Sequence, residues 1–281
     1  QIKDVVAYAA SKYINVVPEI EMPGHALAAL ASYPELSFDS TQTYKVSPTW
    51  GVFEQVFCPS ETTFKFFEGV MDEVVELFPS EYIHIGGDEC PKTAWKNSAF
   101  CQQLIRQLGL KDDVTPSKVD GVKHSKEDKL QSYFVTRMEK YLNDKGRNII
   151  GWDEILEGGL APNATVMSWR GVEGGLNAAK AGHNAIMTPM PYAYLDFYQE
   201  DPAIAPTTIG GYTTLKKTYS YNPAPDDADE LVKKHVIGMQ GNIWREYMKN
   251  SDRTDYQAFP RAMAIAETGW TLDANIMAGR D

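Results

Sequence analysis

The stretch Tyr82-Ile83-His84-Ile85-Gly86-Gly87-Asp88-Glu89 joins a short apolar segment to two glycines and two neighbouring acids. The segment 82–85 has the length and composition of a buried strand. The two glycines have no Cβ atoms, so a ligand can approach the backbone closely where the strand ends. Polar side chains directly after a buried strand are typical of the active-site end of α/β proteins.

Strand-then-helix units recur on both sides of this stretch. The other apolar runs that predict strands lie at 14–20, 148–152, 165–169, 185–188 and 236–243. Buried strands that alternate with helices indicate a parallel sheet, and no Gly-rich phosphate loop follows any of them, which disfavours a nucleotide-binding sheet. The pattern predicts an α/β fold of the (β/α)8 TIM-barrel type, with about six of the eight βα units present.

This count predicts a single barrel domain over residues 1–281 that is incomplete at its N-terminal side, with two further strands upstream of Gln1. The chain opens on a helical pattern at 2–13, in which Tyr8 and Tyr13 are predicted to pack in the core.

Composition and charge exclude several classes of protein. The 281 residues are 43% hydrophobic, and 27 basic against 38 acidic residues give a net charge of −11. An acidic chain without a run of Lys or Arg is a poor partner for nucleic acid, and no apolar stretch approaches the ~18 residues of a membrane span. The three cysteines allow one disulfide, favour no pair and match no CxxC zinc pattern; they are Cys58, Cys90 and Cys101.

Polar and aromatic side chains gather where the predicted strands end. Tryptophans occupy equivalent places after three strands, at 152, 169 and 244. A single tryptophan there is more often core packing, but three in register beside carboxylates favour a sugar pocket, because CH faces stack on rings and hydroxyls donate to acids. The other candidate residues at strand ends are His25, Tyr194, Asp196 and Glu246.

Six motifs follow one another in the order of a known family. They are Pro-Glu-Ile-Glu-Met-Pro-Gly-His (18–25), His-Ile-Gly-Gly-Asp-Glu (84–89), Gly-Trp-Asp-Glu (151–154), Trp-Arg-Gly (169–171), Tyr-Leu-Asp (194–196) and Trp-Arg-Glu (244–246). In this order they resemble the bacterial β-N-acetylhexosaminidases of glycoside hydrolase family 20. The chain departs from the family pattern at Glu21, where the family usually has Asp, and at Tyr212, in a loop where the family often has a further Trp. The family's sugar-binding Arg and the Asp partner of its pocket His lie on the two barrel strands predicted upstream.

The resemblance implies an exo-acting enzyme that removes terminal non-reducing β-linked GlcNAc or GalNAc. The implied mechanism is retaining and substrate-assisted, through an oxazolinium intermediate. Glu89 would be the general acid, Asp88 would bind the acetamido N–H, and Tyr194 would bind the acetamido oxygen. Because neighbouring residues on a strand point to opposite sides, we expect Asp88 and Glu89 to reach two different groups of one sugar.

The remaining implications concern substrate and surroundings. The substrate-binding residues would be His25, Trp152, Trp169, Asp196, Trp244 and Glu246. No metal or cofactor is implied, and the partners would be N-acetylhexosamine-containing oligosaccharides or glycoconjugates. The family also implies a secreted or periplasmic location.

Three alternatives remain open. The first is a retaining glycosidase with two carboxylates, Glu89 as acid and Glu246 or Asp196 as nucleophile. The second is an inactive or weakly active sugar-binding barrel fragment. The third is a metal site, disfavoured because the two glycines at 86 and 87 break any helical ligand spacing; its ligands would be His25, His84, Asp88 and Glu89.

Overall fold

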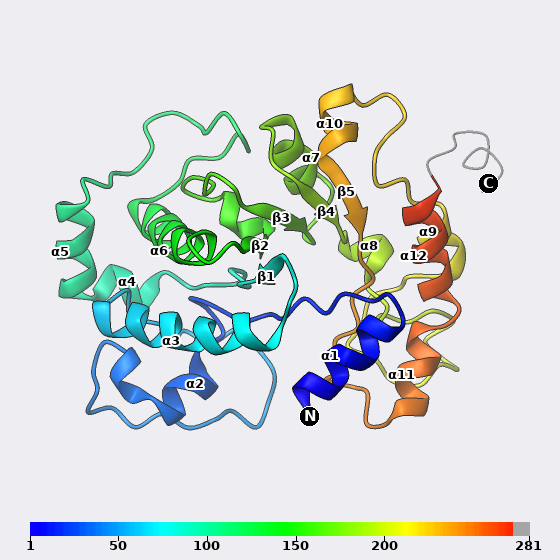
Figure 1. The fold of residues 1–281 in the computed structure, drawn as a ribbon, viewed down its shortest axis with the longest axis horizontal. Helices are drawn as coiled ribbons and strands as arrows, with labels where there is room; N and C mark the ends of the chain where they lie inside the picture. The colour runs from blue at the N-terminus through cyan, green and yellow to red at the C-terminus, as the bar shows by residue number, and fades with distance from the viewer. Residues whose placement is uncertain (272–281) are drawn as a thin grey trace. The chain divides into compact units, whose positions relative to one another are not determined.

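The computed structural model describes residues 1–271, which fall into two compact units. Unit 1 is Gln1–Thr165 and unit 2 is Val166–Asp281, and both contain parallel strands with helices packed on them (Figure 1). The single domain over 1–281 stays a prediction. Among the described residues, no helix has both the length and the apolar character that crossing a bilayer requires.

The sheet of unit 1 is built on β1 (Tyr82–His84) and β2 (Asn148–Trp152), which pair in parallel with Ile83 opposite Ile149. α6 (Lys126–Asn143) packs on β2 and on α3 (Glu61–Leu77) (Figure 1). The other elements of unit 1 are α1 (Ile2–Ser11), α2 (Leu27–Ser32), η1 (Pro34–Leu36), α4 (Thr93–Asn97), α5 (Ala99–Gln107) and η2 (Asp153–Leu156).

Aromatic side chains between α3 and α6 form the core of unit 1. α3 begins after Ser60, whose hydroxyl accepts the Thr63 N–H as an N-cap. Phe64 of α3 packs on Phe134 of α6, with their ring centroids 4.7 Å apart, and both rings are fully buried. Unit 1 also contains the three cysteines as buried free thiols, and Cys90 and Cys101 pack in a cluster around Trp95.

The segment 14–20 is not the buried strand that its composition predicts. Only Glu19 forms a bridge, in parallel with His84. The His84 N–H donates to Pro18 O at 2.9 Å, and the Ile20 N–H donates to His84 O at 2.9 Å, whereas Ile14 remains 59% exposed. The prediction fails before Pro18 because apolar composition alone does not supply a neighbouring strand. The described chain therefore has five strands. The segment 18–22 is extended and hydrogen-bonds to the edge of β1 that does not pair with β2.

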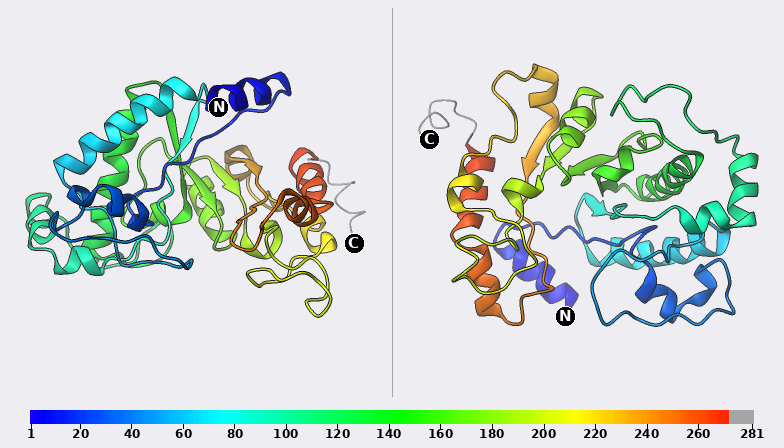
Figure 2. Two further views of the ribbon diagram at one scale, coloured as in Figure 1. Left: turned by 90° about the horizontal axis from the view of Figure 1, so that it is seen from below. Right: turned by 180° about the vertical axis from the view of Figure 1, so that it is seen from behind.

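The N-terminal helix also differs from the prediction. In α1 only Ala9 is buried; Tyr8 is 68% exposed and Tyr13, just after the helix, is fully exposed. The assignment of both tyrosines to the core was wrong. α1 lies beside the C-terminal end of α3, where Lys3 Nζ is 3.5 Å from Glu76 Oε1 (Figure 2).

Unit 2 repeats the strand–helix pattern. β3 (Thr165–Ser168), β4 (Ala185–Met187) and β5 (Val236–Met239) pair in parallel in chain order. The helices of unit 2 are α7 (Glu173–Lys180), α8 (Met190–Ala193), α9 (Leu215–Tyr219), α10 (Glu230–His235), α11 (Ser251–Ala258) and α12 (Arg261–Trp270). α7 and α10 pack on each other and on β4 and β5, while α12 packs on α9 and β5 (Figure 1). The predicted alternation of strands and helices is confirmed.

Candidate active site

The acidic pair lies in a loop after β1. Gly86 and Gly87 have φ angles of 68° and 96°, in the region that favours glycine, and a Cβ at Gly86 would overlap the Glu21 carboxylate. Glu89 itself is left-handed, with φ 42°. A non-glycine residue in this conformation stores backbone strain, a feature that clusters at functional sites. The strand ends at His84, so the expected strand alternation does not decide where Asp88 and Glu89 point.

Both acids approach one histidine. His25 Nε2 lies 3.4 Å from Asp88 Oδ2 and 3.4 Å from Glu89 Oε2. His25 is left-handed too, at φ 46°, and follows Gly24, where a Cβ would come within 2.8 Å of Asp88 O. The hydrogen bond to Asp88 raises the pKa of His25 despite partial burial, and the charges of Asp88 and Glu89 add to this effect.

A second carboxyl group, that of Glu21, lies next to Asp88. Glu21 Oε1 accepts the Gly87 N–H at 2.9 Å, and its carboxyl group is within hydrogen-bonding reach of Asp88. Burial, and then the negative charge of Asp88, raise the pKa of Glu21 far above its ordinary value. Burial opposes ionisation of Asp88, but hydrogen bonds with His25 and Glu21 outweigh it and lower the pKa of Asp88. These effects favour the proton on Glu21 and the negative charge on Asp88.

Asp88 keeps one oxygen for a further partner. Its Oδ1 is buried and receives no N–H or hydroxyl donor from the described residues. A buried acceptor without a donor is costly, so this atom can receive the proton of Glu21 or an N–H from a bound ligand.

Trp152 is fixed next to this loop by Glu19 and His84. Its indole N–H donates to Glu19 Oε1 at 2.9 Å, and its ring lies 4.8 Å from the His84 ring. Its backbone N–H donates to Gly86 O at 2.9 Å. Trp152 is thus a buried aromatic side chain whose backbone is hydrogen-bonded to the loop that carries the acids.

One group of side chains has the spacing of a cation site. The candidate ligand atoms of His25, Asp88 and Glu89 lie within 4.8 Å of one another. His84, which the metal hypothesis included, instead lies with Glu19 and accepts the Gly86 N–H through Nδ1 at 3.0 Å. The three remaining groups already contact one another as an acid–histidine cluster.

In unit 2, the residues after β4 and β5 come together. Leu195 N–H donates to Asn242 O at 2.7 Å, so the parallel pairing of β4 and β5 continues past the strand ends. The Tyr194 ring is stacked on Trp169, with centroids 6.3 Å apart and planes at 29°. Tyr194 is buried, whereas Trp244 is 38% exposed.

Asp196 is the most buried of the acids predicted for the site. It is 4% exposed, and burial, followed by the negative charge of Glu246, raises its pKa to about 7, with its own backbone N–H and Arg261 opposing the shift. Arg261 of α12 is fully buried and donates to Leu195 O at 2.5 Å and to Thr213 O at 2.8 Å. The loop that carries Asp196 is therefore held through its carbonyl groups.

The structure thus brings together His25, Asp88 and Glu89, with Trp152 attached, in unit 1, and Trp169, Tyr194, Asp196 and Glu246 in unit 2. Sequence reasoning assigned no role to Glu19 and named Glu21 only as a departure from the family pattern, although both lie inside the motif 18–25. The available signal was two acids, four and six residues before His25, at the end of an apolar run.

The comparisons with known proteins agree with these features. The model of the family "Glycosyl hydrolase family 20, catalytic domain" matches residues 1–273. The chain is 50% identical over 273 residues to a beta-hexosaminidase of Porphyromonas gingivalis, covering 96% of this chain and 33% of that protein. It is 35% identical over 285 residues to a beta-hexosaminidase of Vibrio furnissii, covering 99% and 44%.

Solved structures give the same result. A Vibrio harveyi GH20 exo beta-N-acetylglucosaminidase in complex with N-acetylglucosamine superposes with a TM-score of 0.80 at 32% identity, over 99% of this chain and 43% of that one. A beta-N-acetylhexosaminidase from Bacteroides fragilis gives 0.77 at 31% identity, over 99% and 54%. The chain spans about half or less of these relatives. The predicted (β/α)8 TIM-barrel type is confirmed, and the chain belongs to the catalytic-domain family of glycosyl hydrolase family 20.

Proposed function

We propose that the protein is an exo-acting β-N-acetylhexosaminidase that cleaves terminal β-linked GlcNAc or GalNAc with help from the substrate's own acetamido group. The observation that supports this most is the loop Asp88-Glu89: Asp88 lies between His25 and Glu21, whose hydrogen bonds lower its pKa, and the Glu89 carboxylate lies 3.4 Å from His25 Nε2. A stable negative charge at Asp88 suits a group that orients a neutral amide and balances developing positive charge.

In the first step, the acetamido carbonyl oxygen attacks C1 and the bond from C1 to the leaving oxygen breaks. Glu89 gives its proton to that oxygen as general acid. The Asp88 carboxylate receives the acetamido N–H. In the second step Glu89 takes a proton from water, the water oxygen bonds to C1, and the bond from C1 to the acetamido oxygen breaks, so the configuration is retained.

The other predicted site residues have binding roles in this proposal. Tyr194 donates to the acetamido oxygen, and Asp196 and Glu246 bind sugar hydroxyls. The indole rings pack on apolar sugar faces and the acetyl methyl group; they are Trp152, Trp169 and Trp244. His25 holds both acids and, with its raised pKa, partly balances their charge.

The names of the relatives support the substrate class, and the V. harveyi structure contains N-acetylglucosamine. The acidic chain suits neutral glycans. The alternative with two carboxylates differs in one testable respect, because it needs no 2-acetamido group.

The test compares an aryl β-N-acetylglucosaminide with the matching aryl β-glucoside. We expect release of the aryl alcohol from the first and essentially none from the second, because only the first carries the nucleophile. A thiazoline analogue of the oxazolinium should inhibit competitively. Efficient cleavage of the glucoside would contradict the proposed mechanism. The 281-residue chain should be tested beside the same chain extended to the length of its relatives. Activity of the extended chain alone would show that further residues are needed, and inactivity of both would contradict the proposed function.

A further inference from the structure

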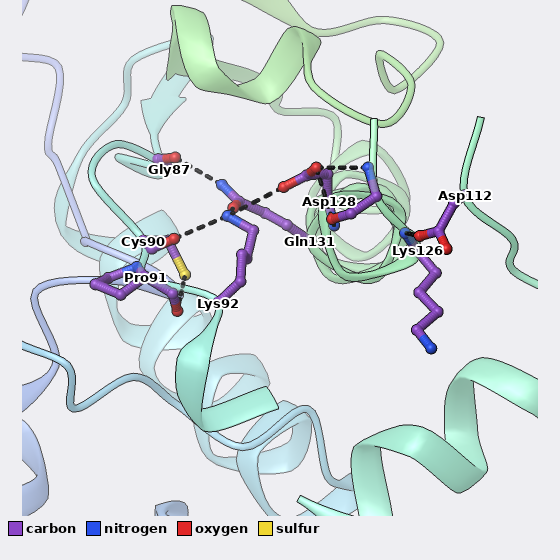
Figure 3. Close-up of polar contacts among 9 residues, drawn as sticks. Gly87, Cys90, Pro91, Lys92, Asp112, Lys126, Asp128 and Gln131 are labelled. Carbon is purple, nitrogen blue, oxygen red and sulfur yellow. Dashed lines mark hydrogen bonds and ion pairs between the residues drawn. The ribbon is translucent and has the colours of Figure 1, made fainter. Parts of the chain in front are cut away.

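Two backbone carbonyl groups bracket the acidic pair, and both are bound by side chains from outside the loop. Gln131 Nε2 of α6 donates to Gly87 O at 2.7 Å, and Lys92 Nζ donates to Cys90 O at 2.8 Å (Figure 3). Asp88, Glu89 and the N–H and Cα of Cys90 lie between these two carbonyl groups. The peptide planes fixed in this way are 87–88, directly before the acids, and 90–91, one residue after them.

The two side chains also bind each other. Lys92 Nζ donates to Gln131 Oε1 at 2.6 Å, and the Asp128 carboxylate lies 3.8 Å from the same ammonium group (Figure 3). Lys has three donors and no acceptor, so the amide oxygen of Gln131 must face Lys92. The amide nitrogen is then left to face Gly87 O. Lys92 thus orients Gln131.

Burial restricts the movement of the Gln131 and Lys92 side chains. Gln131 is 3% exposed, and the Lys92 side chain is 15% exposed. The preceding peptide, 86–87, is bound as well, because the Gly87 N–H donates to Glu21 Oε1. A left-handed Glu89 persists only where its surroundings hold the backbone in place.

We propose that Gln131 and Lys92 are positioning residues that fix the Asp88-Glu89 loop for catalysis. The role rests on the proposed function, since it acts through the two acids, and neither residue needs to contact the substrate. A displacement of a catalytic group by about 1 Å can cost about 100-fold in rate. Loss of the hydrogen bonds from Gln131 and Lys92 to the loop should therefore lower kcat more than it raises KM.

The test uses Gln131→Leu, Gln131→Glu and Lys92→Met. Gln131→Glu keeps the volume and the partner of Lys92 but replaces the N–H donor with an oxygen that faces Gly87 O. The matched control is Gln102→Leu, because Gln102 Nε2 donates to Trp95 O at 3.1 Å and to Glu127 Oε1 at 2.9 Å in unit 1, and neither acceptor belongs to the segment 87–90.

We expect both Gln131 variants to lower kcat by about 100-fold with little change in KM, and Gln102→Leu to leave kcat near wild type. The double variant Gln131→Leu/Lys92→Met should be no slower than the slower single variant, because the two side chains act as one unit. Full activity in Gln131→Glu, or equal losses in Gln131→Leu and Gln102→Leu, would overturn the proposal.

Hydrogen exchange of the amides at 87–90 gives a readout that does not require turnover. Faster exchange in Gln131→Leu than in Gln102→Leu supports the positioning role of Gln131, and equal exchange overturns it. If the wild-type protein cleaves no N-acetylhexosaminide, the proposed function fails, while the exchange experiment still decides whether Gln131 and Lys92 hold the loop.

Discussion

The two neighbouring acids of the site differ in their surroundings. Asp88 contacts His25 and Glu21 and keeps its charge, while Glu89 contacts His25 and is 38% exposed. Two carboxylates in unlike environments can take different roles in one reaction. In the proposed mechanism, the ionised acid orients the acetamido group and the exposed acid transfers the proton.

Substitution of each acid should separate these roles. Glu89→Gln should lower kcat/KM by about 10²- to 10⁴-fold for alkyl or sugar leaving groups, because the general acid is lost. A dinitrophenyl leaving group needs no proton, so its first step should suffer much less. Asp88→Asn should lower kcat for both kinds of substrate, because charge stabilisation does not depend on the leaving group. Equal damage by Glu89→Gln to both substrates would contradict the acid role.

The protonated Glu21 should leave a signature in stability against pH. The pKa of Glu21 is raised above its ordinary value of 4.5 in the folded protein, so above pH 4.5 the folded state holds a proton that the unfolded state has lost. The free energy of unfolding should therefore fall as pH rises from 4.5 toward the raised pKa. Glu21→Gln should flatten this slope in urea unfolding at several pH values. Glu73→Gln, on the exposed side of α3, is the control and should keep the wild-type slope.

At the scale of elements, helices hold the functional loops through carbonyl groups. In unit 1, Gln131 of α6 binds the loop that carries the acids. In unit 2, Arg261 of α12 binds the loop that carries Asp196. Buried donors on rigid helices restrict loops that would otherwise be mobile. The two units thus use the same physical solution with different side chains.

The N-terminal helix offers a test of packing. Because Tyr8 is 68% exposed, Tyr8→Ser should change the free energy of unfolding by no more than about 0.5 kcal/mol. Phe134→Ala, in the fully buried aromatic core, should cost about 3–5 kcal/mol. Chemical unfolding of both variants measures the difference. A large loss in Tyr8→Ser would mean that α1 packs on a partner through this face.

The strand β1 and the helix after Ser60 were predictable because local signals agree: an apolar run ends in two glycines, and a capping serine precedes an apolar stripe. The segment 14–20 was mispredicted because hydrophobicity indicates burial but not the neighbour that provides it. Asp88, Glu89 and His25 were predictable from motifs. Gln131 was not, since a Gln on a helix has the same sequence signal whether it faces solvent or a backbone carbonyl group.

At the scale of the whole molecule, the charge of −11 should select among substrates. Sulfated N-acetylhexosaminides should be repelled at low ionic strength, where screening extends over about 30 Å at 0.01 M salt. We expect kcat/KM for a sulfated aryl substrate to rise several-fold as salt is increased to about 0.15 M, where the screening length falls to about 8 Å. The neutral substrate should change little. An equal salt response of both substrates would show that the net charge does not steer binding.

The positions of the cysteines allow one unit to be labelled chemically and not the other. All three cysteines lie in unit 1 and are buried as free thiols, so unit 2 carries none. A thiol-reactive dye added to the native protein reaches them when unit 1 opens, so its uptake reports the opening of unit 1, and it gives the rate of that opening at dye concentrations where labelling outpaces reclosing. Any loss of structure confined to unit 2 would be invisible to the dye but visible by circular dichroism. The two signals, recorded together during heating, would tell whether the units melt in one transition or in two.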